Sequence, residues 1–341
     1  MSRIPAPRRV PVLAVILVPV FLAALALAAF SWTSARLAPR GLPLGVAGPR
    51  AAAAAEQQLA RHPGAFSIHY YPDQARAVAG IRHRSVYGAI VSTGSGATVF
   101  TASAASPLVA RLLANAATAA GPAAGPAARV RVADLVPADR NDPQGIVFGA
   151  ALLPLVLVGA IGGVVTRTAA GPAPLRAAFA AAAAAVVGLI AAGLIQGWLG
   201  IIPGNWIVNG GVIALTVLAI AAGVGGLASL AGYPGLAVGA LLMVFCGNPF
   251  SAVGSAPEML PVPAGAIGQL LPPGAGQELL RSAAYFGGNG SAGHLAVLIV
   301  WAVAGITAVL AGDMLRPRRA APGAVAAAVG DTAPDGTAVG G

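Results

Sequence analysis

Long stretches without a charged residue constrain this chain more than any other feature of its sequence. The first covers residues 10–30 (VPVLAVILVPVFLAALALAAF), which as a helix rising about 1.5 Å per residue would be roughly 31 Å long. The hydrocarbon core of a bilayer is about 30 Å thick. Only 9% of all residues are charged, against roughly 25% in typical soluble domains. The sequence therefore predicts an integral membrane protein.

Five more apolar runs follow, so the sequence predicts six membrane-spanning helices. A cleaved signal peptide is disfavoured, because the first run is longer than a signal-peptide core and no small-residue cleavage site follows it. Gly232-Tyr233-Pro234 indicates a tight turn between the fourth span and a short fifth one. The later runs cover residues 146–165, 177–195, 206–230, 235–246 and 293–311.

Arginine placement predicts how these helices are oriented. The chain has no lysine, which also excludes a P-loop for ATP, and the arginines next to the spans form three groups. Cytoplasmic connections usually carry an excess of basic residues. With the N-terminus inside, six spans put all three groups in the cytoplasm, so we expect a multi-pass plasma-membrane protein with both termini cytoplasmic. The groups are Arg3, Arg8 and Arg9; Arg167 and Arg176; and Arg316, Arg318 and Arg319.

Residues 35–143 have a different character from the rest of the chain. They hold eleven of the twenty arginines and three of the four histidines, and short strand-like and helix-like pieces alternate. Such alternation is typical of a small α/β domain, which the predicted orientation places outside the cytoplasm. The predicted strands are 42–47, 66–71, 85–92, 97–101 and 130–136, and the predicted helices are 51–61, 74–81 and 107–119.

The predicted fold class is therefore a polytopic α-helical membrane protein with six transmembrane helices and an extracytoplasmic α/β domain between spans 1 and 2. The chain divides into a cytoplasmic tip with the first span (1–34), the outer domain (35–143), a five-span permease-like domain (144–315) and a tail (316–341). The tail is rich in Ala, Gly and Pro, a composition that predicts disorder.

The polar side chains form no recognisable catalytic or metal-binding pattern. His62, His69 and His83 have no acid or cysteine at ligand spacing, and Ser95 lies outside the frame of a nucleophile elbow. Cys246 is the only cysteine, which excludes an intrachain disulfide. The arginines form no stripe with interleaved aromatics, as nucleic-acid binding would require. We therefore expect no enzyme, no cofactor or metal, and no nucleic-acid partner.

The most unusual stretch is 247–276 (GNPFSAVGSAPEMLPVPAGAIGQLLPPGAG), which is too apolar for an exposed loop and too rich in Pro and Gly to span. Irregular backbone at membrane depth must be shielded by protein or line a watery cavity. We expect a re-entrant element with Glu258 hydrated at the outer mouth; an ordinary outer loop packed on the outer domain is the alternative. Residues 277–286 predict an amphipathic helix along the membrane surface, in which Glu278 and Arg281 are spaced to form an ion pair one turn apart. The predicted outer-gate residues are Asn248, Pro249, Pro257, Glu258, Pro261, Pro272, Pro273 and Gly274.

The order of one N-terminal span, a large outer domain and a five-span block resembles the ABC-2 type transporter permeases, and among them the phage-infection-protein-like membrane proteins. The segment "GNPFS…APEMLP…IGQLLPPGAG…LLRSAAYF" carries most of the likeness, together with "VYGAIVS" and "GATVFTASAAS" in the outer domain. The resemblance covers roughly residues 10–315. It implies short re-entrant or surface helices before the last span, and export with a separate ATPase subunit.

Two functions follow as expectations. The first is a permease or exporter component of ABC-2 type in the lipid bilayer, working as a homodimer with a separate ATPase. The predicted cytoplasmic loops are very short, so they offer little surface for binding an ATPase subunit. The alternative is a non-transporting envelope receptor or assembly protein, whose outer domain binds a ligand or a cell-wall component.

Overall fold

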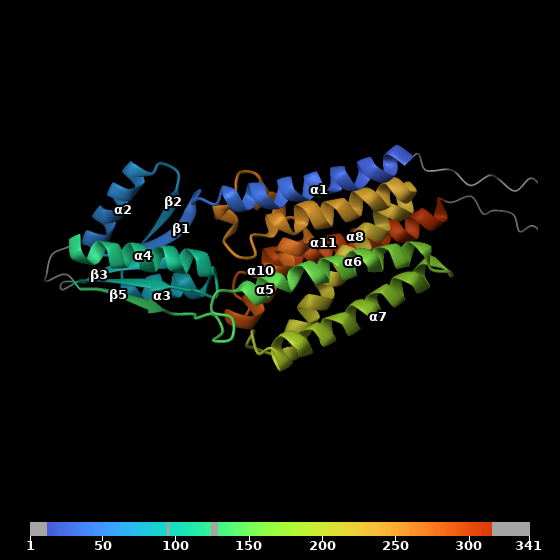
Figure 1. Ribbon diagram of the computed structural model, residues 1–341. Coiled ribbons are helices and arrows are strands. Elements are labelled where there is room, and N and C mark those ends of the chain that lie inside the picture. The colour runs from blue at the N-terminus through green and yellow to red at the C-terminus, as the bar shows by residue number, and fades with distance from the viewer. Residues whose placement is uncertain (1–11, 94–95, 124–128, 316–341) are drawn as a thin grey trace, which may run out of the picture.

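The computed structural model describes residues 12–93, 96–123 and 129–315, and it has two parts, a small sheet domain and a bundle of long helices (Figure 1). The predicted tail 316–341 and the terminal arginines lie outside the described residues. The ends of the described chain both lie at the end of the bundle that is remote from the sheet (Figure 1). The sheet domain is inserted between the first long helix and the later ones, as the sequence predicts.

In the part of the chain that the structure describes, five helical segments are long and apolar enough to cross a membrane, which makes this a multi-pass membrane protein. The run predicted at 146–165 is broken near its start: one helix ends at Ala150 and the next begins at Leu152, because Pro154 cannot donate a hydrogen bond to the carbonyl of Ala150. The segments are α1 (Val12–Ala35); α5 (Ile146–Ala150) with α6 (Leu152–Thr168); α7 (Ala173–Ala192) with the π-helical turn η1 (Gly193–Trp198); α8 (Trp206–Leu241) with the π-helical turn η2 (Leu242–Gly247); and α11 (Ala292–Met314).

Helix α8 folds back on itself at Gly232, which has φ 67° and ψ −140°. A Cβ built on Gly239 would lie 3.1 Å from the Cα of Val224, although these residues would be about 22 Å apart in a straight helix. The backbone at Gly235 likewise meets that of Leu227. The predicted turn is therefore confirmed, and the runs predicted as the fourth and fifth spans are two limbs of one helical hairpin.

The first limb of α8 is the centre of the bundle, and glycines let its neighbours approach. A Cβ on Gly163 of α6 would lie 2.7 Å from Cβ of Val224, and one on Gly188 of α7 would lie 2.4 Å from the carbonyl oxygen of Gly210. A Cβ on Gly226 would lie 2.7 Å from the carbonyl of Gly305 in α11. Close backbone packing at small residues is how membrane helices commonly associate.

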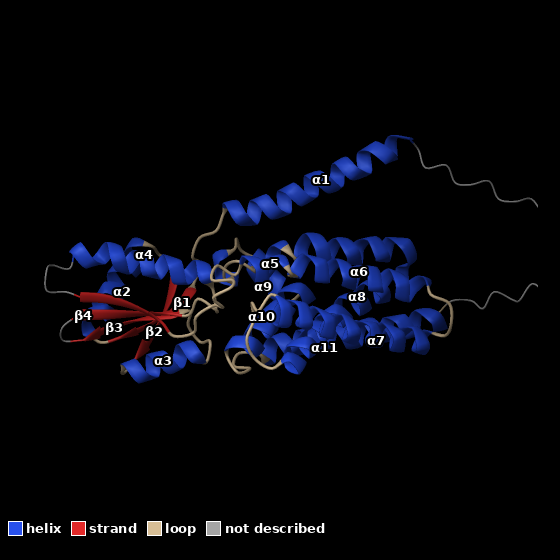
Figure 2. Ribbon diagram, turned by 60° about the horizontal axis from the view of Figure 1, so that its bottom comes forward, coloured by secondary structure: helices blue, strands red, loops and turns tan. Residues whose placement is uncertain are grey.

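The sheet domain contains every strand and helix that the sequence predicts. Strand order is β2-β1-β3-β4-β5, in which β3 and β4 form an antiparallel hairpin and the other neighbours are parallel. Helices α2 and α4 cover one face and α3 the other (Figure 2). The strands are β1 (Leu42–Ala47), β2 (Phe66–Tyr71), β3 (Gly88–Thr93), β4 (Gly96–Thr101) and β5 (Arg129–Asp134); the helices are α2 (Pro49–Arg61), α3 (Gln74–Arg82) and α4 (Pro107–Ala123).

Local sequence signals explain these element boundaries. Asp73 caps α3, because its carboxylate accepts a hydrogen bond of 2.8 Å from the N–H of Arg76. Successive residues of β1 face opposite sides of the sheet: Val46 packs with Ala51 and Ala55 of α2, whereas Ala47 packs with Ala77 of α3.

The broken segment 247–276 folds into short helices that lead into a longer one. Prolines occupy the first turn of α10, where a missing N–H has no cost. The predicted surface helix at 277–286 is wrong in position: α10 begins at Pro272 and is buried on nearly every side between the sheet domain and the bundle (Figure 1). The short elements are η3 (Pro249–Ser251), η4 (Pro257–Met259) and α9 (Ala264–Gln269), followed by α10 (Pro272–Tyr285).

Candidate functional site

The sheet domain rests directly on the broken segment. Where the chain passes from α1 to β1, the N–H of Ala38 donates to the carbonyl of Met259 (3.0 Å) and the N–H of Arg40 donates to the carbonyl of Glu258 (2.9 Å). The Arg40 guanidinium adds a second hydrogen bond of 2.9 Å to Met259. Backbone groups that helices would normally satisfy are thus paired across the boundary, which explains why so irregular a segment is stable when buried.

Apolar side chains complete this contact. Leu42 and Leu44 from β1 and Val109 from α4 pack against Ala256 and Met259 beside η4. All five side chains are buried. The sheet domain and the broken segment therefore share one hydrophobic core, and the broken segment is part of the platform on which the domain sits.

A buried ion group lies beside this core and joins the two parts of the molecule. Glu278 of α10 contacts two guanidinium groups, that of Arg281 one turn further along α10 (2.5 Å) and that of Arg84 just after α3. The exposed fractions of the Arg84, Glu278 and Arg281 side chains are 9%, 3% and 4%. Arg84 also donates to the carbonyl of Glu278 (3.1 Å) and to the hydroxyl of Ser282.

Burial alone would oppose ionisation of Glu278. The adjacent guanidiniums of Arg281 and Arg84 outweigh that effect and hold the pKa of the Glu278 carboxyl below its ordinary value. Arg84 has φ 61°, a conformation that costs a non-glycine residue on the order of 1–3 kcal/mol. Its guanidinium also lies 5.2 Å from the centre of the Phe286 ring. These contacts hold Arg84 in a strained conformation at the boundary.

Glu258 occupies a different place from the hydrated outer mouth that the sequence predicts. It is half-buried beneath the sheet domain, and the Tyr87 hydroxyl donates to its carboxyl oxygen Oε2 at 3.0 Å. Burial raises the pKa of the Glu258 carboxyl, and burial together with the nearby Glu258 raises the pKa of Tyr87 well above its ordinary value. The expectation of a freely hydrated charge is wrong, because the domain packs over this position.

The predicted gate residues are distributed over the whole platform and do not surround a single opening. Pro257 and Glu258 lie in η4 below the sheet, Asn248 and Pro249 lie where η2 passes into η3, and Pro261 is buried before α9. Pro272, Pro273 and Gly274 form the first turn of α10 and are buried: a Cβ on Gly274 would lie 2.2 Å from the carbonyl of Gly268, and one on Gly247 would lie 2.6 Å from the Pro273 ring. A gating role for these residues stays a prediction.

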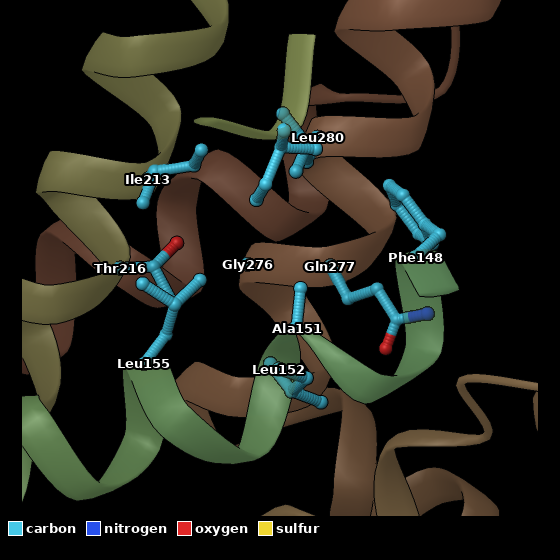
Figure 3. A pocket seen from close by; sticks show the side chains of 10 residues that line it. Phe148, Ala151, Leu152, Leu155, Ile213, Thr216, Gly276, Gln277 and Leu280 are labelled. Atoms are coloured by element: carbon cyan, nitrogen blue, oxygen red, sulfur yellow. The ribbon is translucent and has the colours of Figure 1, made fainter. Parts of the chain in front are cut away.

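Beneath α10 lies a small apolar crevice (Figure 3). Its volume is about 30 Å³, the share of one water molecule in the liquid. Gly276 brings α10 against α8 here, since a Cβ on it would lie 2.3 Å from Oγ1 of Thr216. The walls come from α5, α6, η1, α8 and α10: Phe148, Ala151, Leu152, Leu155, Ile195, Ile213, Thr216, Gly276, Gln277 and Leu280.

Gln277 is a polar group at the edge of this crevice (Figure 3). Its Nε2 donates to the carbonyl of Val253 (3.2 Å), and its Oε1 is buried without a hydrogen-bond partner among the described residues. An unpaired buried carbonyl is costly. The side chain of Gln277 is therefore held beside the crevice at a cost in free energy.

At the other end of the bundle, two arginines predicted as cytoplasmic join the helix ends. The Arg176 guanidinium contacts the Asp313 carboxylate of α11 at 2.5 Å and donates to the carbonyl of Thr166 (3.2 Å). The Arg167 Nε donates to the carbonyl of Ala228 (3.1 Å). These residues therefore link α6, α7, α8 and α11.

Sequence reasoning found the pairing of Glu278 with Arg281 from their spacing, but it missed Arg84 and Tyr87. The sequence did contain one signal for these contacts, because acidic residues are rare in this part of the chain: Glu258 is the only acid between Asp142 and Glu278. Acids that are rare in an apolar stretch are expected to have specific partners.

No protein family, curated protein or solved structure matches the chain. Within residues 12–93, 96–123 and 129–315, no three His, Cys, Asp or Glu side chains are grouped so that they could hold a metal ion. The fold and its contacts define a multi-pass membrane protein with a docked α/β domain.

Proposed function

We propose that this protein is a membrane transport component of permease type. In this proposal the helices from α5 to α11 enclose the path, and α10 with the short helices before it closes the outer end. The observation that carries the proposal is the position of α10, a buried helix that covers an apolar crevice inside the bundle. The resemblance to ABC-2 type permeases points the same way, since it implies short helices before the last span.

The proposed topology has six passes, counting each limb of α8 as one. The second limb, from Tyr233 to Gly247, would be about 22 Å long, which is shorter than the roughly 30 Å hydrocarbon core. The short helices η3, η4 and α9 then complete the outer layer as a re-entrant element. Arg167 and Arg176 lie on the cytoplasmic side, as the positive-inside rule favours.

The crevice sets the class of cargo. Its walls are almost entirely apolar, so they suit an apolar or amphipathic molecule. A volume of about 30 Å³ admits nothing larger than water, so the proposed path is closed in this conformation. Opening requires α10 to move away from α6 and α8. The buried, unpaired Oε1 of Gln277 would gain a partner in that movement.

A homodimer and a separate ATPase belong to the same proposal. A specific observation favours the alternative, an envelope receptor or assembly protein. The connection between α6 and α7 covers only residues 169–172, and the turn within α8 is equally tight, which leaves little described surface for an ATPase to grip. A docked outer domain fixed by a buried ion group also suits a receptor.

A dye-efflux measurement separates the two functions. Cells producing the protein are loaded with the apolar dye Nile red, and retention is compared between wild type, Leu155→Trp and Leu157→Trp. Leu155 lines the crevice, whereas Leu157 of the same helix is 44% exposed on the lipid-facing side. We expect faster efflux with the wild type, a loss of at least tenfold with Leu155→Trp, and no change with Leu157→Trp.

The amount of folded protein is measured for each variant by size-exclusion chromatography. Efflux from wild-type cells that is no faster than from cells lacking the protein would overturn the transport proposal in favour of the receptor. Co-purification from native membranes then tests the ATPase: an ATP-binding subunit in stoichiometric amount supports the ABC-2 type.

A further inference from the structure

A second and larger cavity lies at the boundary between the sheet domain and the bundle. Its volume is about 230 Å³, which at about 30 Å³ per water corresponds to roughly eight water molecules. It receives residues from every part of the molecule that meets there: Arg84 and Tyr87 from the sheet domain, Glu258 from η4, Glu278 from α10 and His294 from α11.

The charges around this cavity are already partly paired. Both carboxylate oxygens of Glu278 accept from guanidiniums, one from Arg84 and one from Arg281. Two positive charges therefore face one negative charge in this group. Ionised Glu258 would bring the whole set to neutrality, because it adds the second negative charge. These four side chains, Arg84, Arg281, Glu278 and Glu258, then have no net charge together, but the positive charge lies on the Arg84 side of the cavity and the negative charge on the Glu258 side.

Apart from Gln269 of α9, whose Oε1 is buried without a hydrogen-bond partner among the described residues, apolar side chains form the rest of the wall. Pro43 and Val86 come from the sheet domain, Ala105 precedes α4, and Pro257 begins η4. Gly290, which is exposed, marks the edge of the cavity. The cavity therefore combines a small apolar surface with the paired charges of Arg84 and Glu278 and with the carboxyl group of Glu258 on a separate element.

From this arrangement we propose that the cavity binds a small zwitterion, a molecule of amino-acid size with one ammonium and one carboxylate group. The ammonium group pairs with Glu258 beside the Tyr87 hydroxyl, and the carboxylate lies toward Arg84 and His294. A simple cation is repelled by Arg84 and a simple anion by Glu258, so only a molecule with both charges matches both sides. Because the lining comes from the sheet domain, η4, α10 and α11, the bound zwitterion stabilises docking of the outer domain.

This inference does not depend on transport through the bundle. It is tested on the full chain in nanodiscs by isothermal titration calorimetry with L-alanine, ethylamine and acetate as probes. L-alanine should bind saturably, and ethylamine and acetate at least tenfold more weakly. Glu258→Gln should weaken L-alanine binding at least tenfold, whereas Glu56→Gln, on the exposed face of α2, should leave it unchanged.

The pH dependence provides a readout that a purely structural role would not produce. Because burial raises the pKa of Glu258, affinity should fall as acidification protonates this carboxyl, and the fall should vanish in Glu258→Gln. Absence of saturable L-alanine binding would overturn the proposal. So would equal binding of the three probes, or unchanged affinity in a Glu258→Gln protein whose melting temperature is that of the wild type.

Discussion

Replacing Glu278 by Gln should release the outer domain from the bundle while leaving both parts folded. Gln has nearly the same shape, but it leaves the guanidiniums of Arg84 and Arg281 without their shared anion. All three side chains are at most 9% exposed, so solvent screens them little. Removing one partner of a buried ion pair typically costs about 3–5 kcal/mol. That corresponds to an opening equilibrium raised by about 140-fold to about 4000-fold.

Hydrogen exchange measured by mass spectrometry in nanodiscs reads this equilibrium directly. Peptides from α10, and peptides of the sheet domain near β3 that face the bundle, should exchange hydrogen faster by about the factor calculated for the opening equilibrium. The centre of α8 should keep its protection. Glu56→Gln removes a carboxylate from the exposed face of α2 and serves as the matched control.

A triple variant tests the whole ion group. Arg84→Met, Glu278→Met and Arg281→Met together remove all three charges and leave apolar groups of similar volume, a change that is often neutral or stabilising for a buried ion group. The triple variant should therefore exchange more slowly at α10 than Glu278→Met alone, which leaves two buried guanidiniums without their shared anion. Unchanged exchange at α10 in Glu278→Gln, or an equal rise throughout the bundle, would refute the assignment of this ion group to docking.

Further predictions concern pH, topology and the α8 turn. The lowered pKa of Glu278 contributes docking stability that is lost as pH falls through that pKa. The raised pKa of Glu258 contributes stability that is lost as pH rises through that pKa. The melting temperature should therefore be highest at mildly acidic pH, and Glu258→Gln should remove its decline above that pH. A cysteine at Ser291 should react with a membrane-impermeant thiol reagent in intact cells, and one at Thr168 only after lysis. Gly232→Ala should destabilise the protein by about 1–3 kcal/mol, measured by thermal unfolding, because its backbone conformation is nearly restricted to glycine.

Each of these experiments has a control or an opposing result. For the turn, Gly211→Ala is matched, since Gly211 is helical and a Cβ there would meet nothing within 4 Å; equal effects of the two variants would remove the special role of Gly232. For topology, Cys246 is replaced first, and labelling at Thr168 in unlysed cells would exclude six passes. For pH, a melting temperature that does not change between mildly acidic and neutral pH would contradict the contribution of Glu258.

The sequence predicted those features that depend on neighbouring residues. The apolar runs, the turn at Gly232 and the alternation of strands and helices in the outer domain arise from local pattern, and the structure contains them all. The pairing of Glu278 with Arg281 follows from helix spacing. Each of these required only one segment of the chain.

The site could not be predicted in the same way, because its contacts join distant segments. Tyr87 and Glu258 are separated by 171 positions and Arg84 and Glu278 by 194, and no periodicity relates them. The hydrated position expected for Glu258 assumed an outer surface without the sheet domain on it. The surface helix at 277–286 failed for the same reason: an amphipathic pattern shows that one face is apolar, but it does not reveal that a second protein layer covers the polar face.

Helix α1 has a mechanical consequence for the joint under the outer domain. Its most apolar window has no residue buried against the bundle, and its last turns touch the short helices through Trp32, whose ring lies 6.1 Å from that of Phe250. The height of α1 is therefore set by lipid, which adjusts helices to the thickness of the bilayer. Just past its end, Ala38 is hydrogen-bonded to Met259. We expect a thicker bilayer to pull α1 away from the broken segment and to put tension on this hydrogen bond. Faster hydrogen exchange at η4 in lipids with longer chains would measure that tension.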